Sequence, residues 1–204
     1  MENFSVLTAI AVWYPRANVD TDLIIRVERC AKVEKEDLGQ YAFEMVRFLP
    51  DGSDNPEFPL NSAPFRNAQI LIGNVNFGCG SSREMAVWAI AGMGFRCVIA
   101  PSFGEIFFGN CFQNGLLPVI LPLEAVTALG TALEADPTNV RVSVDLERQV
   151  VVAPDGTEHA FEIEPLRRKA LLEGLDQIGQ TRLRDAEIAA FQQQDRLKRP
   201  WVYV

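Results

Sequence analysis

Histidine is nearly absent from the sequence: His159 is the single example in 204 residues. A catalytic triad built on histidine, or a metal site built on several, needs partners around the imidazole ring. His159 instead follows the turn-forming run Pro154-Asp155-Gly156, which predicts a surface position in a hairpin. Any catalysis by this chain is therefore expected to proceed without histidine.

The four cysteines are widely spaced and include no C-x-x-C pair. They are Cys30, Cys79, Cys97 and Cys111. Zinc ribbons and local iron–sulfur motifs need closely spaced thiolates, so this spacing predicts no metal ligands in the chain. We expect reduced, partly buried thiols.

Positive charge and long apolar runs are also scarce. The chain has 19 Lys and Arg against 27 Asp and Glu, a formal net charge of -8, which argues against a nucleic-acid partner. No stretch approaches the roughly 20 apolar residues that cross a bilayer. The start, Met1-Glu2-Asn3, lacks the basic segment of a signal peptide. We therefore expect a cytoplasmic protein that binds no membrane.

The apolar pattern predicts an α/β fold. Apolar residues make up 48% of the chain and charged residues 23%, as in ordinary folded proteins. A first strand is expected at residues 5–13. Strands at 68–73, 96–100 and 116–121 then alternate with helices at 82–92, 103–112 and 123–134, which indicates parallel β-α-β units. Alternating stretches at 140–146, 149–152 and 157–163 predict a small antiparallel meander in this mixed sheet.

The remaining segments carry weaker signals. Residues 32–48 have helical spacing, and residues 49–64 are expected to form a long surface loop. Pro165 predicts the start of a helix that ends at Gly174, and Asp185 is expected to cap a last helix that runs to residue 194. The tail at residues 200–204 is apolar enough to dock on another surface.

One glycine- and serine-rich stretch, F-G-C-G-S-S-R-E at residues 77–84, separates a predicted strand from a predicted helix. Its glycines permit a sharp turn, and Ser81 with Glu84 fits the S-x-x-E capping box that begins helices. Arg83 places a cation beside the unpaired N–H groups of the helix start, which together favour a carboxylate or phosphate. The same pattern also fits a plain strand–helix junction, and both interpretations remain open.

A second polar stretch, Asp20-Thr21-Asp22, precedes an apolar run. These side chains could cap a turn, or they could rim a polar cleft and orient a catalytic group.

Several segments together carry a family resemblance. The most specific is N-F-G-C-G-S-S-R-E at 76–84; the others are residues 18–22 with 24–25, 98–103 with 106–107, 109–110 with 114, 116–119, and 175–176 with 178–179. With them the chain resembles the small subunits of the bacterial isopropylmalate dehydratases, in the aconitase superfamily. The resemblance covers most of the chain.

The resemblance implies a swivelling β/β/α three-layer domain over residues 1–204, with a helical extension from about residue 165. It implies a large partner subunit that holds a [4Fe–4S] cluster, with no cofactor bound by this chain. The implied reaction is dehydration and rehydration of a hydroxy-dicarboxylate in leucine biosynthesis, and this chain alone should be inactive.

The resemblance also implies roles for individual residues. Ser81 matches the position of the base that takes the carbon-bound proton, while Gly80, Ser82 and Arg83 would bind substrate carboxylates. Asp20, Thr21 and Asp22 would rim the site and orient Ser81 or Arg83.

The sequence departs from the family pattern at residues 26–30, where Arg26-Val27-Glu28-Arg29-Cys30 replaces a proline and an aromatic–leucine pair. The resemblance places substrate choice in this segment, so Arg26 and Arg29 could favour a more anionic substituent than an isopropyl group. Alternatively, they face solvent or pair with Glu28. Met85 and Val87 also replace a histidine and a proline of the common forms.

Three functions therefore remain open. The first is a catalytic small subunit that acts on isopropylmalate. The second is a paralogous subunit for another hydroxy di- or tricarboxylate, of the methylmalate, homocitrate or citrate type. The third is a non-catalytic domain that binds a carboxylate or a partner, which the joint presence of Ser81, Ser82 and Arg83 disfavours.

Overall fold

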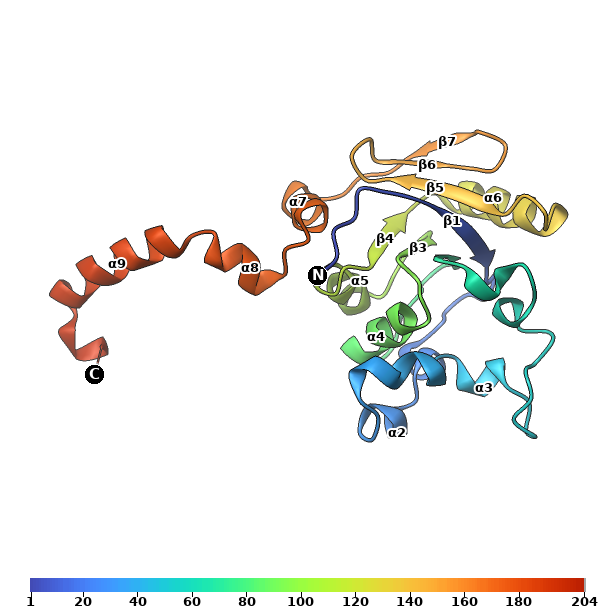
Figure 1. Cartoon of the computed structure of the whole chain (residues 1–204), viewed down its shortest axis with the longest axis horizontal. Helices are drawn as coiled ribbons and strands as arrows, with labels where there is room; N and C mark the ends of the chain where they lie inside the picture. The colour runs from blue at the N-terminus through green and yellow to red at the C-terminus, as the bar shows by residue number, and fades with distance from the viewer. Residues whose placement is uncertain (204) are drawn as a thin grey trace.

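The computed structural model describes residues 1–203 and contains, within them, one mixed seven-stranded sheet (Figure 1). The strand order is β4-β3-β2-β1-β5-β6-β7. The strands are β1 (Val6–Trp13), β2 (Ile70–Ile72), β3 (Cys97–Ala100), β4 (Leu117–Ile120), β5 (Arg141–Asp145), β6 (Val150–Val152) and β7 (Glu158–Ala160).

The first four strands are parallel, and single helices join β2 to β3 and β3 to β4. Helix α4 (Glu84–Gly92) connects β2 to β3, and α5 (Glu105–Gln113) connects β3 to β4. The strands β2 and β3 are buried along their whole length, as continuous apolar runs in a parallel sheet should be. Pro118, which lacks an N–H, lies in β4 at the edge of the sheet.

The antiparallel half continues the same sheet. Helix α6 (Leu123–Ala135) returns the chain to β5, which pairs antiparallel with β1 from Val6 opposite Asp145 to Ile10 opposite Arg141. Strands β6 and β7 complete the meander, and His159 lies partly buried in β7 at the outer edge. The predicted α/β class, with β-α-β units and an antiparallel meander in one mixed sheet, is confirmed.

The curled sheet separates two apolar cores. Val12, Leu71 and Val98 point from β1, β2 and β3 into the core beneath α4, whereas Ile70 and Ile99 point to the opposite face. There they pack with the apolar side of α6, which buries Val126, Leu129 and Leu133. Because successive side chains of a strand point to opposite faces, the same strands supply both cores.

The segment between β1 and β2 forms only short helical pieces. They are α1 (Thr21–Ile24), α2 (Val27–Cys30), η1 (Lys35–Tyr41), α3 (Glu44–Arg47), η2 (Pro59–Asn61) and η3 (Phe65–Asn67). The expectation of a surface loop at 49–64 is wrong in part, because Leu60 and Asn61 are buried. The Asn61 amide donates to the carbonyls of Arg47 and Asn55, which holds this stretch against the body.

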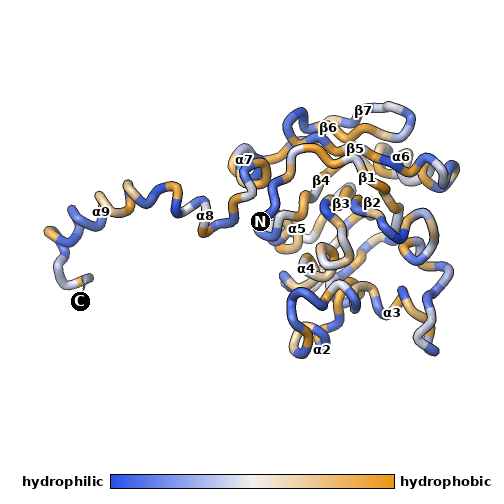
Figure 2. Tube along the Cα trace, viewed as in Figure 1, coloured by the Kyte–Doolittle hydropathy of each residue, from blue (hydrophilic) through white to orange (hydrophobic). Residues whose placement is uncertain are grey.

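The C-terminal region begins as predicted and then leaves the body. Helix α7 (Pro165–Glu173) ends at Gly174 with a φ of 67°, which confirms the glycine stop. An unexpected helix α8 (Gln177–Arg182) precedes α9 (Asp185–Lys198) and the short η4 (Pro200–Val202). Helices α8 and α9 extend away from the sheet and mix polar and apolar residues (Figures 1 and 2).

One expectation for this region needs correction. Asp185 is not the cap of α9, because Arg184 takes the N-cap position and the helix runs on to Lys198. In the tail, Trp201 is 70% exposed, and the Tyr203 hydroxyl donates to Asp195 in α9. Docking of the tail on another surface stays a prediction. Val204 lies outside the described residues.

Within residues 1–203, no helix is both long and apolar enough to cross a membrane.

Candidate active site

The candidate site lies where the parallel strands β1, β2 and β3 end. The carboxyl ends of parallel strands share one edge of a sheet, where ligands of open α/β folds commonly bind. Backbone hydrogen bonds tie the loops together: Gly78 N–H donates to the Val19 carbonyl at 2.7 Å, and Thr21 N–H to the Cys79 carbonyl at 2.9 Å. The fold therefore brings residues 18–22 beside the glycine–serine loop.

Close contact with an aromatic cluster supports the loop from below. Gly78 has a φ of +71°, and a Cβ there would lie 2.2 Å from the Phe107 ring, so no other residue fits without rearrangement. Phe103 stacks on Phe107, and Phe77 meets both rings edge to face. The start of the loop is thus packed closely against α5.

Gly80 and Thr21 set the position of Ser81. Gly80 has a φ of +87°, which turns the chain above Asp20. The buried Thr21 side chain donates its hydroxyl to the Ser81 carbonyl at 2.9 Å. The Ser81 and Ser82 side chains are left exposed, and neither hydroxyl has a hydrogen-bond partner among residues 1–203. No side chain in that range is therefore placed to take a proton from Ser81.

The predicted capping box is wrong. Helix α4 begins at Glu84, its N-cap is Arg83, and no side chain caps it. Ser81 is held back in the loop by Thr21, and the Glu84 carboxylate accepts from the Asn114 amide at 2.8 Å instead of reaching back along the chain. The Asn114 carbonyl oxygen in turn accepts from the Trp88 indole. This network anchors the start of α4. It could not be predicted from the local sequence, because Asn114 lies 30 residues from Glu84.

Arg83 is held at the site by Asp22. Its Nη1 lies 2.5 Å from Asp22 Oδ1, and the Arg83 side chain is 16% exposed against 57% for Asp22. This hydrogen bond raises the pKa of Arg83, which stays charged. Asp20, by contrast, caps α1 by accepting from the Leu23 N–H at 2.7 Å. The structure thus brings Asp20, Thr21 and Asp22 against residues 80–83.

The two arginines of the 26–30 segment are paired. Arg26 Nη2 lies 3.3 Å from Glu28 Oε1, as one of the two interpretations expected. Arg29 forms a forked pair with Glu44, at 3.0 Å from Nε and 2.8 Å from Nη2, and it lies over the Tyr41 ring. Glu44, whose side chain is 13% exposed, was not identified from the sequence, because it lies in a short helix fifteen residues away. Two arginines and two glutamates leave this cluster with no net charge.

The cysteines do not fit an iron–sulfur cluster. Such clusters are held by several thiolates at one centre, whereas no group of three or more potential ligands lies within residues 1–203. Cys97 and Cys111 are buried, and burial raises the pKa of both thiols far above the ordinary value. Cys30 and Cys79 are only partly buried near the loop, and burial raises their pKa values as well.

The arrangement is suited to binding an anion. The exposed residues Ser81 and Ser82 lie next to Arg83 in sequence, directly before the N-terminal end of α4. Helix N-termini and forked arginine donors both favour carboxylates. Among residues 1–203, the loop leaves Ser81 and Ser82 open to solvent.

Two family models match the chain. A model described as the aconitase C-terminal domain matches residues 1–124, and a model described as LeuD_N matches residues 128–165.

Full-length relatives carry a shared name. The 3-isopropylmalate dehydratase small subunit of Gluconacetobacter diazotrophicus is 54% identical, over 98% of this chain and 97% of that protein. The protein of the same name from Paramagnetospirillum magneticum is 47% identical, over 99% of this chain and 100% of that protein. A crystal structure of 3-isopropylmalate dehydratase from Methanocaldococcus jannaschii is similar with a TM-score of 0.67 and 25% identity, over 91% of this chain and 98% of that chain.

Proposed function

The chain belongs to the 3-isopropylmalate dehydratase small subunits of the aconitase superfamily, and we propose that its loop at residues 80–83 supplies one half of the active site. Members of this family are subunits of a hydro-lyase of leucine biosynthesis. The observation that carries the proposal is the open surface formed by the Ser81 and Ser82 hydroxyls beside the paired Arg83.

Ser81 is the proposed base. In the dehydration, its alkoxide oxygen accepts the proton that leaves one carbon, and the bonding electrons form the carbon–carbon double bond. The hydroxyl leaves the adjacent carbon as water after it takes a proton from a second acid, which we assign to the partner subunit. Rehydration reverses these steps at the other carbon. A serine alkoxide is costly in water, so Ser81 depends on nearby positive potential. The Arg83 guanidinium and the start of α4 supply it.

Gly80, Ser82 and Arg83 are proposed to bind the substrate carboxylates. Asp22 occupies one N–H group of Arg83, which leaves other donors of the guanidinium for a substrate carboxylate. Asp20 and Thr21 rim the site, and Thr21 positions Ser81 through its hydrogen bond to the Ser81 carbonyl.

The name small subunit implies a larger partner subunit. We propose that this partner closes the open side of the site and carries the [4Fe–4S] cluster, since the thiols of this chain do not fit one. Residues 1–204 would then act as a single swivelling domain, with residues 165–204 as its helical extension, in a cytoplasmic enzyme. The chain alone is expected to be inactive.

A different hydroxy-acid substrate is not favoured, because the relatives share one name across the full chain. The pairing of Arg29 with Glu44 agrees with this, since it cancels the charge that a more anionic substituent would need. Arg29→Leu should therefore leave the ratio of turnover on isopropylmalate and on a more anionic acid unchanged.

The test is anaerobic reconstitution with the large subunit of the same organism. Alkene absorbance would be followed with 3-isopropylmalate and with methylmalate, homocitrate and citrate, and with this chain alone as control. We expect turnover of 3-isopropylmalate only in the assembled enzyme. Preference for another acid, or activity of the isolated chain, would contradict the proposal.

A further inference from the structure

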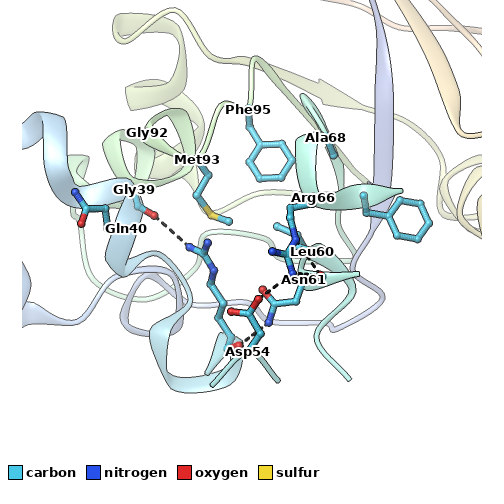
Figure 3. Close-up of a pocket in the computed structure, with 12 residues that line it drawn as sticks. Gly39, Gln40, Asp54, Leu60, Asn61, Arg66, Ala68, Gly92, Met93 and Phe95 are labelled. Carbon is cyan, nitrogen blue, oxygen red and sulfur yellow. Dashed lines mark hydrogen bonds and ion pairs between the residues drawn. The ribbon is translucent and has the colours of Figure 1, made fainter. Parts of the chain in front are cut away.

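A cavity of about 350 Å³ lies at the opposite end of α4 from the candidate active site (Figure 3). Gly92 and Met93 line it from the C-terminal end of the helix, whereas the loop at residues 80–83 precedes Glu84 at the other end. Nine helical residues separate the two places by roughly 13 Å along the axis. The cavity is therefore a separate feature of the chain.

One wall is built by the close approach of two backbones. A Cβ on Gly39 would lie 2.3 Å from the Gly92 carbonyl carbon, and a Cβ on Gly92 would lie 2.9 Å from the Gly39 nitrogen. The segment η1 and the end of α4 are thus in direct contact. This wall of the cavity is therefore formed by the backbones of Gly39 and Gly92.

A second wall is apolar. Leu60 and Phe95 are buried, and Phe65 and Met93 complete the lining on this side. In Figure 3, Met93 and Phe95 project into the space between Gly39 and Leu60. This side of the cavity would accommodate a compact hydrocarbon group.

The polar side carries one positive charge without a partner. Arg66 is satisfied, because its Nη2 lies 2.9 Å from Asp54 Oδ2 and 2.8 Å from the Asn61 carbonyl oxygen. Arg47 forms no ion pair within residues 1–203. Its Nη1 reaches only the Gly39 carbonyl at 3.4 Å, and its buried Nε has no hydrogen-bond partner.

Without a ligand, the partly buried and unpaired guanidinium of Arg47 costs free energy of folding. Burial lowers the pKa of its guanidinium; the nearby Asp54 carboxylate acts against this, and Arg66 acts in the same direction as burial. A buried donor without a partner is also rare in folded proteins. An anion in the cavity beside the guanidinium would balance its charge.

We propose that this cavity binds a small monocarboxylate with a compact apolar group, whose carboxylate pairs with Arg47. The single unbalanced charge matches one carboxylate, and the guanidinium can donate two parallel hydrogen bonds to it. Leu60, Phe65, Met93 and Phe95 cover the apolar group. The volume falls at the small end of ligand sites, which favours such a molecule over a nucleotide.

The test uses 4-methylpentanoate and its neutral counterpart 4-methylpentanamide as probes, with the amide NMR signals of Gly39 and Gly92 in the full chain as reporters. We expect a saturable shift of both signals with the carboxylate only. Arg47→Met keeps the apolar stem and should weaken binding roughly tenfold or more. Arg83→Gln, which alters the candidate active site, should leave this binding unchanged.

Three results of this titration on the isolated chain would overturn the proposal. One is the absence of a saturable shift, and another is equal binding of the amide. The third is unchanged binding in a folded Arg47→Met variant, which would assign Arg47 only to its contact with the Phe48 ring. Should Arg47→Met fail to fold, Arg47→Lys takes its place, with weaker but charge-dependent binding expected.

A carboxylate side chain of the partner subunit would have the same chemistry. The titration is therefore repeated on the assembled enzyme, where binding of 4-methylpentanoate should persist. Its loss on assembly would overturn the proposal in favour of a subunit contact.

Discussion

Arg83 Nη1 lies 2.5 Å from Asp22 Oδ1, across a gap of 61 residues in sequence. The pair joins the loop after β1 to the loop after β2 at the carboxyl edge of the sheet. Asp22 is mostly exposed, so the pair contributes little to stability. Its effect is to fix the direction of the guanidinium that we propose binds substrate.

Arg83→Lys tests this use of the guanidinium. Lysine keeps the charge but lacks the fork that grips a carboxylate. We expect kcat/KM of the reconstituted enzyme to fall roughly 10- to 100-fold, mainly through KM. Arg148→Lys is the matched control, since Arg148 also pairs with a carboxylate, that of Glu158, through one guanidinium nitrogen and lies far from the site in sequence. Equal effects of the two substitutions would contradict a binding role for Arg83.

Gly80→Ala separates backbone strain from function. Gly80 has a φ of +87°, and a Cβ would lie 3.3 Å from Asp20 Cβ. Gly156 has nearly the same φ, +88°, with nothing within 4 Å. Each alanine should cost about 1–2 kcal/mol of unfolding free energy, measured in urea. Only Gly80→Ala should also reduce turnover of the reconstituted enzyme; an equal loss with Gly156→Ala would remove Gly80 from the site.

Gly130→Ala tests the packing of the core beneath α6. A Cβ on Gly130 would lie 2.1 Å from the Trp13 ring, whereas Gly109 in α5 has nothing within 4 Å. We expect Gly130→Ala to lower the unfolding free energy by about 1–3 kcal/mol. Gly109→Ala should be neutral or stabilise by about 0.5–1 kcal/mol. Urea unfolding measures both, and a stable Gly130→Ala variant would contradict the close contact of α6 with β1.

The elements that the sequence predicted well are those with local causes. The end of α7 at Gly174 follows from one residue that adopts a positive φ. The buried strands β2 and β3 follow from short β-branched runs between turn signals. The candidate site could be located because its loops follow these strands.

The details that the sequence missed depend on distant partners. Helix α4 begins at Glu84, later than the sequence predicted. The Glu84 carboxylate bonds the amide of Asn114, which lies 30 residues away. The balancing of the Arg29 charge depends on Glu44, which only the fold of the short helices brings near. The unpaired Arg47 is visible only when its surroundings are known, since sequence alone does not show which cations lack a carboxylate.

The central claim is that Ser81 is the base, and Ser81→Ala in the reconstituted enzyme tests it most directly. Ser5→Ala serves as control, because Ser5 is also exposed but lies before β1, outside the site loops. Assembly with the large subunit would be checked by size-exclusion chromatography, and turnover of 3-isopropylmalate by alkene absorbance. We predict that Ser81→Ala assembles normally and loses roughly 100-fold or more in kcat, while Ser5→Ala behaves as the unaltered enzyme. Turnover by Ser81→Ala at the level of the Ser5→Ala enzyme would contradict the account.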